Sequence, residues 1–174
     1  ILYGAKAPGY TANIDNLEDA KFHVLRLKEL GAISVKSYNQ PRRDQKQQVI
    51  AAGRELGIMV VPEGGAKFYH NMTMVVDGHT GVEHALPIAN VYDDVNQLWS
   101  QTEVGYSPTF GVAYGGLSGE TYWYDRTNVW QNKKLMSYTP KYFVEPNAIR
   151  RTTAPDSHYN HFNVAKTAKQ LNDK

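Results

Sequence analysis

Apolar residues recur along the first part of the chain with the spacing of one helix face, and short apolar runs follow. Within 16–31 they stand at Leu17, Ala20, Val24 and Leu27. Asn16, three residues before Asp19, has the spacing of a helix N-cap, and Gly31 supplies a stop. The pattern therefore predicts a helix over 16–31 and a strand over 33–37 directly after it.

The succession of a helix pattern and a strand pattern repeats three more times along the chain. The next predicted helix opens with Pro41 at a first helical position and ends at Gly57. Further helices are predicted over 66–76, 91–101 and 160–172, and strands over 58–61, 81–85 and 106–113. Strict alternation of helix and strand implies parallel strands joined by right-handed crossovers.

The spacing of the units favours one α/β architecture. The residues at the predicted strand ends, Lys36, Glu63, His84 and Thr109, follow one another at intervals of about 25 residues, and eight such units give the size of a (β/α)₈ TIM-type barrel. An open doubly wound sheet fits the same alternation. No Gly-x-Gly-x-x-Gly follows a strand to favour it.

The regular pattern stops after Ala113. The segment 114–157 begins with a glycine-rich stretch and carries the aromatic residues Tyr114, Tyr122 and Trp123. A long segment without regular pattern inside a compact domain is either a lid that contacts substrate or a packed excursion. We therefore treat these three aromatic residues as substrate-binding candidates.

Composition narrows the function classes. The formal net charge is +2, and Lys and Arg do not collect into a stripe, which argues against a nucleic-acid partner. Hydrophobic residues make up 41% of the chain, as in globular proteins, yet no apolar run approaches the roughly 20 residues of a membrane span. The chain has no Cys, which excludes disulfides and thiolate metal sites.

Polar side chains stand where the strands of a barrel would open into the active-site mouth. Lys36 and Tyr38 end one strand, Glu63 follows the next, and His84 ends the third. Arg42, at a helix start, could clamp a substrate carboxylate or be a solvated surface residue. We expect Glu63 and Tyr38 to be catalytic, and Lys36, His84 and Glu63 to lie at a metal site.

The role of Lys36 stays open on its local pattern. A buried amine has a lowered pKa, so it could form a Schiff base with a carbonyl substrate. It could instead take up CO₂ as a metal-binding carbamate, or extend its ammonium group into water. His84 could hold a zinc-like ion or be a hydrogen-bonded core His, and Glu63 could ligate metal, act as a base or interact with the next helix. His70 and His79 are expected at the surface.

Three segments together resemble the amidohydrolase superfamily. They are Ser34-Val35-Lys36-Ser37-Tyr38-Asn39-Gln40-Pro41-Arg42-Arg43, Val60-Val61-Pro62-Glu63-Gly64-Gly65 and Asp77-Gly78-His79-Thr80-Gly81-Val82-Glu83-His84. The nearest likeness is to imidazolonepropionase-related barrels that follow a Tol-B-like β-propeller. The resemblance implies a metal-dependent hydrolase that acts on carbon–nitrogen bonds other than ordinary protein peptide bonds, through metal-activated water.

The resemblance also implies the metal ligands. That family uses His-x-His on the first strand, a carbamylated Lys on the fourth, His on the fifth and sixth and Asp on the eighth, around one or two divalent ions, commonly zinc. Lys36 matches the fourth-strand Lys and His84 the sixth-strand His. Where the fifth-strand His is expected, this sequence has Pro62 followed by Glu63. Glu63 either replaces that ligand, or the site holds one metal, or this subgroup works differently.

No His-x-His occurs in the sequence, so the resemblance implies a central fragment, about the fourth to seventh β/α units, inactive alone. Expected partners are the rest of the barrel, a β-propeller domain, a second copy of the chain, and a cyclic amide, N-acyl amino acid or small peptide as substrate. The kinship would suit an exported or periplasmic protein. A Schiff-base lysine enzyme and a non-catalytic barrel scaffold are the alternatives.

Overall fold

The computed structural model describes residues 13–38, 40–110, 121–149 and 153–173. Its four strands in these ranges are short and parallel: β1 (Ser34–Ser37), β2 (Met59–Pro62), β3 (Gly81–Glu83) and β4 (Gly105–Ser107). β1 pairs with β2 and β3 pairs with β4, and a single parallel bridge between Glu63 and Glu83 joins the two pairs. The strands therefore follow one another in space in the order of the sequence.

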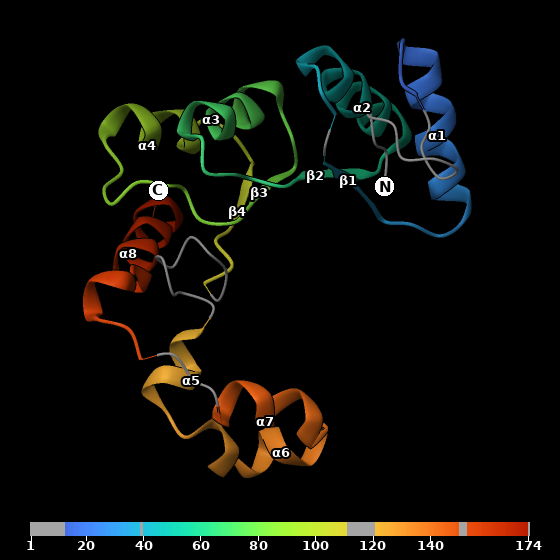
Figure 1. Cartoon of the computed structure of the whole chain (residues 1–174). Helices are drawn as coiled ribbons and strands as arrows, with labels where there is room; N and C mark the ends of the chain where they lie inside the picture. Colours follow the sequence, from blue (N-terminus) through green and yellow to red (C-terminus); the bar gives the residue numbers. More distant parts are fainter. Residues whose placement is uncertain (1–12, 39, 111–120, 150–152, 174) are drawn as a thin grey trace.

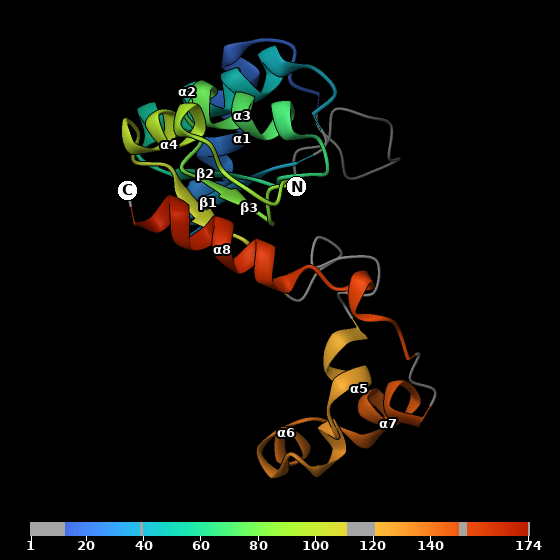
Figure 2. The same cartoon turned by 90° about the vertical axis from the view of Figure 1, so that its left-hand side faces the viewer.

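Four helices lie on one side of this layer of strands (Figures 1 and 2). They are α1 (Leu17–Glu29), α2 (Arg43–Leu56), α3 (Phe68–Asp77) and α4 (Asp93–Ser100). The buried faces of α1 and α2 meet β1 and β2 in one apolar cluster, which includes Val24, Val35 and Val49. A second cluster joins α3, α4 and β3 through residues such as Met74 and Trp99.

Local signals set several of the helix ends. The side chain of Asn16 accepts a hydrogen bond from the backbone N–H of Asp19 at 2.9 Å, which confirms the predicted cap of α1. Gly57 and Gly78 end α2 and α3 in the left-handed conformation that glycine adopts without steric cost. The predicted start of α2 at Pro41 is wrong by two residues, because the backbone N–H of Arg42 is capped by the Gln45 side chain and the helix begins at Arg43.

Two strands, β3 and β4, end earlier than the sequence pattern predicts. β3 stops at Glu83 because His84 takes a positive φ of 70°, and β4 stops at Ser107, two residues before Thr109, whose φ is 50°. Neither backbone conformation continues a strand. The predicted strand residues 111–113 lie outside the described ranges.

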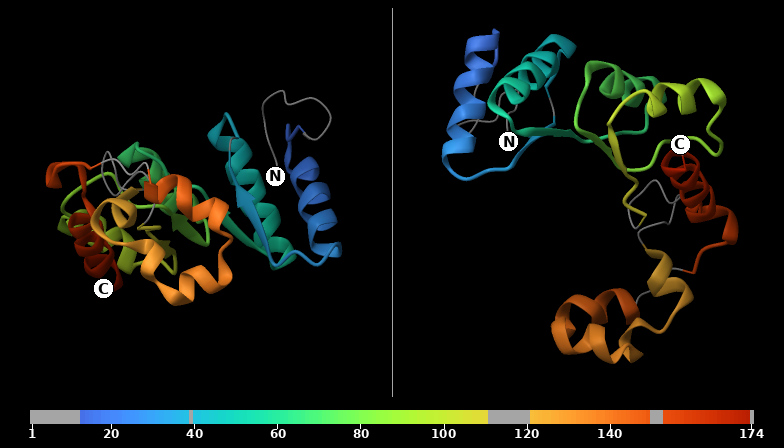
Figure 3. Two further views of the ribbon diagram at one scale, coloured as in Figure 1. Left: turned by 60° about the horizontal axis from the view of Figure 1, so that its bottom comes forward. Right: turned by 180° about the vertical axis from the view of Figure 1, so that it is seen from behind.

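The later part of the chain contains helices that its sequence pattern does not reveal. They are α5 (Tyr122–Arg126), η3 (Val129–Gln131), α6 (Lys133–Tyr138), α7 (Lys141–Ile149) and η4 (Asp156–His158). Most are too short to show a helical period, and α5 to α7 stand apart from the strands (Figure 3). The lid-like role of 114–157 remains a prediction.

The last helix, α8 (His161–Asn172), agrees with its predicted range and packs against α4 and β4. It lies beneath the strands in Figure 2, with α1 to α4 above them. Its Leu171 is buried in the second apolar cluster. None of the described helices is both long enough and apolar enough to span a bilayer.

Candidate functional site

Glu63 connects two of the residues that the sequence analysis selects. Its Oε2 lies 2.6 Å from Lys36 Nζ, and its Oε1 lies 3.1 Å from His84 Nε2. Lys36 belongs to β1, Glu63 follows β2 directly, and His84 follows β3 directly. Three neighbouring strands therefore each contribute one polar side chain to a single cluster.

The backbone brings these residues together. In the β1–β2 register Lys36 stands opposite Val61, and beyond the strand the Glu63 N–H donates to the Ser37 carbonyl at 3.2 Å. The next residue, Gly64, donates its N–H to the Glu83 carbonyl at 2.9 Å. A Cβ at Gly64 would collide with that carbonyl oxygen, so glycine is required for this approach. In the sequence alone, Gly64 stands out only as part of a segment that resembles the amidohydrolase superfamily.

The charges of Lys36 and Glu63 in this cluster are complementary. Burial alone would raise the pKa of Glu63, but hydrogen bonds from Lys36 and His84, and their charges, outweigh burial and lower it. The hydrogen bond to Glu63 raises the pKa of Lys36 against a smaller opposing effect of burial. Lys36 is therefore a cation and Glu63 a carboxylate near neutral pH.

This result corrects the expectation of a buried Lys36 with a lowered pKa. The Lys36 side chain is 53% exposed, and its ammonium group also lies over the Tyr38 ring, 4.9 Å from the ring centroid. Both contacts stabilise the charged form. The geometry thus gives no support to a neutral, Schiff-base-forming amine, and it places Tyr38 where it can orient the lysine.

His84 is held in a costly backbone conformation. A φ of 70° is uncommon for residues other than glycine, and such conformations gather at functional sites, where the surrounding structure holds them. Here the His84 N–H donates to the Ser107 carbonyl at 2.8 Å. The turn directs the imidazole, whose side chain is 17% exposed, toward Glu63.

The cluster provides part of the donor set that a divalent ion needs. Glu63 and His84 bring a carboxylate and an imidazole nitrogen together, which are ordinary zinc ligands. Within residues 13–38, 40–110, 121–149 and 153–173, no group of three or more His, Cys, Asp or Glu side chains could hold a metal ion. Lys36 as an ammonium group would repel a cation and fits the site only as a carbamate.

An open cavity of about 480 Å³ lies beside Glu63. Tyr38, Lys46 and His70 also line it. Lys46 belongs to the first turns of α2 and His70 to the first turn of α3, so the cavity lies at the carboxyl ends of the strands, where active sites of parallel α/β proteins form. The sequence pattern predicts a cavity position for neither Lys46 nor His70. It predicts a surface position for His70, and that residue is exposed.

Arg42 is not part of the Glu63 cluster. Its guanidinium pairs with Asp44 at 3.1 Å, and both side chains are about half exposed. The neighbouring Arg43 binds Asp77 at 2.6 Å. The role of Arg42 in substrate binding therefore stays a prediction.

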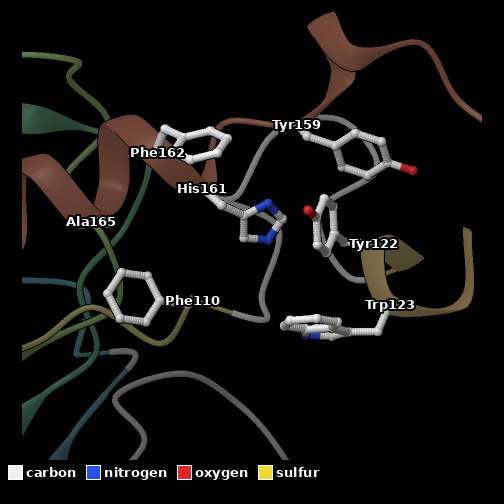
Figure 4. A pocket seen from close by; sticks show the side chains of 7 residues that line it. All are labelled: Phe110, Tyr122, Trp123, Tyr159, His161, Phe162 and Ala165. Carbon is white, nitrogen blue, oxygen red and sulfur yellow. The ribbon is translucent and has the colours of Figure 1, made fainter. Parts of the chain in front are cut away.

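Tyr122 and Trp123 line a different, apolar pocket of about 360 Å³ (Figure 4). The Tyr122 ring lies 4.7 Å from His161 and 5.0 Å from Tyr159, measured between ring centroids. Phe110, three residues beyond β4, forms another wall. The aromatic residues thus gather around a pocket, while Tyr114 lies outside the described residues.

The predicted surface position of His79 is wrong. His79 is only 2% exposed, and its Nδ1 and Nε2 lie 3.1 Å from the Met74 carbonyl and 3.1 Å from Ser37 Oγ. Burial lowers its pKa to about 4, so the ring is neutral at physiological pH. It joins the end of β1 to the turn after α3, and this contact between distant residues has no local sequence signal.

No family model matches this chain, and no curated protein sequence matches it. Among solved structures, the chain is similar to a Xaa-Pro dipeptidase with methionine bound in its active site. The sequence identity is 13% and the TM-score 0.48, over 97% of this chain and 38% of the dipeptidase chain. This chain thus spans well under half of that protein, and a likeness at this level does not establish a family.

Proposed function

We propose that this chain is the central part, about the fourth to seventh units, of a (β/α)₈ barrel in a metal-dependent hydrolase. The enzyme would cleave carbon–nitrogen bonds in cyclic amides, N-acyl amino acids or small peptides. One observation carries the proposal: the two carboxylate oxygens of Glu63 reach Lys36 and His84 from a strand between theirs. Sequential parallel strands with α1 to α4 on one side support the barrel.

Each residue has a definite part in this proposal. Nε2 of His84 and the Glu63 carboxylate would hold a divalent ion, such as zinc, together with a carbamate on Lys36 and ligands from elsewhere in the intact protein. When bound, such an ion supplies Lewis acidity and a water whose pKa is about 7. Tyr38 orients the Lys36 side chain, and Arg42, Tyr114, Tyr122 and Trp123 would contact the substrate.

Proton transfer is assigned to Glu63. Its lowered pKa keeps it a carboxylate near pH 7, and it already accepts a hydrogen bond from Lys36 Nζ. Carbamate formation requires a neutral Lys36 amine, so a proton must leave Nζ first, and Glu63 is the acceptor in contact with it. Glu63 would release that proton to solvent, where the second proton liberated by carbamate formation also goes, and the free carboxylate could then accept a proton from an attacking water.

Metal content tests the proposal. The intact protein, purified from zinc-supplemented medium, should contain about one or two zinc ions per chain, and Lys36→Ala should lose at least one ion. Lys166→Ala is the control, because the Lys166 ammonium group binds Asn90 and none of the assigned metal ligands. Full zinc occupancy in Lys36→Ala would refute the assigned ligand.

Two other results would replace the proposal with an alternative. A substrate adduct trapped on Lys36 by borohydride, with activity that survives a chelator, would indicate a Schiff-base enzyme. A metal-free intact protein whose Lys36→Ala and His84→Ala variants match the parent in every assay would indicate a non-catalytic scaffold.

A further inference from the structure

Lys46 and His70 form a basic pair outside the Glu63 cluster. Lys46 Nζ lies 3.2 Å from His70 Nε2, so the neutral imidazole accepts a hydrogen bond from the ammonium group. Both residues line the cavity beside Glu63 and also a second, neighbouring cavity of about 360 Å³. The proposed chemistry uses neither residue.

The charge of this pair is only partly offset by an acidic side chain, because Asp77 raises the pKa of Lys46 through its charge without forming an ion pair with it. Among the described residues, no carboxylate forms an ion pair with Lys46, while the adjacent Arg42 and Arg43 are paired with Asp44 and Asp77. Burial lowers the pKa of Lys46, and burial with the charges of Lys46 and Lys67 lowers that of His70. A partly buried cation without a counter-ion is destabilising unless an anion joins it.

Both bases also stand at helix positions that favour the opposite charge. Lys46 lies in the first turns of the 14-residue α2, and His70 lies in the first turn of the 10-residue α3, which has no acidic residue in that turn and no side-chain cap. Acidic groups stabilise helix N-termini and basic groups do not. The N-terminus of α3 and two bases therefore direct positive potential into one cavity, whereas Asp44 in the first turn of α2 offsets the N-terminus of that helix.

We infer that Lys46 and His70 form a subsite that binds the free carboxylate of the substrate, with the bond to be cleaved toward Glu63. The inference rests on the proposed hydrolase, and it selects among its substrates: N-acyl amino acids and small peptides carry such a carboxylate, whereas neutral cyclic amides do not. The cavity suits this orientation because Lys46 and His70 line it together with Glu63.

Binding to the full chain tests this subsite without any turnover. N-acetylglycine and N-acetylglycinamide differ in the carboxylate, and calorimetry with each should show the acid binding about tenfold tighter, as expected for one charge-assisted hydrogen bond. Lys46→Met should abolish the preference and Lys46→Arg should restore most of it. Lys133→Met, at the start of α6, is the matched control and should behave like the parent.

A nuclear magnetic resonance titration of the His70 ring supplies a second readout. The acid should raise the pKa of His70 because the bound carboxylate offsets the charges of Lys46 and Lys67, and the amide should not. Equal affinity for acid and amide, or a preference that survives in Lys46→Met, would overturn the subsite. Inorganic phosphate that binds there more tightly than the acid would overturn the carboxylate assignment. The zinc content of the intact protein is measured separately, so either hypothesis can fail alone.

Discussion

The backbone N–H of Gly64 donates to the carbonyl of Glu83 at 2.9 Å, and this contact joins the β1–β2 pair to the β3–β4 pair. It also holds Glu63, the residue before Gly64, beside His84, the residue after Glu83. The Cα of Gly64 is close enough to the neighbouring strand that a side chain would strike the Glu83 carbonyl. The close approach of the two strand pairs at the candidate site therefore requires a residue without a side chain at position 64.

Replacing Gly64 should therefore affect both stability and site geometry. Gly64→Ala should lower the free energy of unfolding by about 1–3 kcal/mol, because the new methyl group forces the two strand pairs apart. Gly65→Ala is a matched control at the adjacent residue, since a Cβ there meets no atom within 4 Å. Urea unfolding of both variants measures the difference. Equal stabilities would show that the close approach is not needed.

Glu63→Gln should release Lys36. The hydrogen bond from Lys36 to Glu63 is the largest cause of the raised lysine pKa, so the variant should bring that pKa down toward 10.5. The loss of stability at pH 7 should be only about 1 kcal/mol or less, because the Lys36 side chain is half exposed and solvent screens the pair. Titration of the Lys36 amine by nuclear magnetic resonance measures the pKa.

Glu83→Gln is the control for this titration. Glu83 raises the pKa of Lys36 only through its charge and is the smallest of the causes. A larger fall in Glu83→Gln than in Glu63→Gln would show that Lys36 pairs with a different carboxylate. In the parent, the lowered pKa of Glu63 means that its contribution to stability is present above pH 4.5 and is lost as the pH falls further.

Much of the helical structure could be predicted because its signals are local. The Asn16 cap, the glycines after α2 and α3 and the apolar face of α8 all lie within a few residues of the structure they set. Regular spacing of the strand ends also indicated which polar residues would meet, since Lys36, Glu63 and His84 all lie at such ends. The meeting of residues 36, 63 and 84 is thus a consequence of periodicity.

Features that depend on distant contacts could not be predicted in the same way. His79 is buried because its imidazole meets Ser37, 42 residues earlier. The early end of β3 depends on a positive φ at His84, which the strand pattern of 81–85 does not indicate. The exposed, charge-paired state of Lys36 follows from the position of Glu63 relative to it, which the strand pattern alone does not give. Each is set by tertiary packing rather than by local sequence.

The aromatic pocket should respond to substitution of Tyr122. Its ring contacts both Trp123 and His161, so Tyr122→Ala should open the pocket and weaken binding of N-acetylphenylalanine methyl ester, used as an apolar probe. Trp123 is 61% exposed, so quenching of its fluorescence reports binding. Tyr138→Ala, at an exposed residue of α6, is the control. Unchanged affinity in Tyr122→Ala would exclude the pocket as the probe's site.

The buried His79 should make the protein sensitive to mild acid. Its pKa is about 4 in the folded state against 6.5 in the unfolded chain, so the unfolded state takes up a proton first as the pH falls. His79 therefore leaves stability unaffected above pH 6.5 and lowers the free energy of unfolding by about 3 kcal/mol between pH 6.5 and pH 4. Urea unfolding at pH 7, 5.5 and 4.5 measures this loss.

Variants separate His79 from the other histidines that lower stability in acid. His79→Gln should be less stable than the parent at pH 7, because the buried contacts to Met74 and Ser37 are disturbed. Because glutamine does not titrate, the variant should lose less stability than the parent on acidification. His70→Gln removes a histidine that is exposed, whose lowered pKa should contribute less. A parent-like acid response in His79→Gln would mean that His79 is protonated in the folded protein, with its ring hydrogen bonds rearranged to admit the charge.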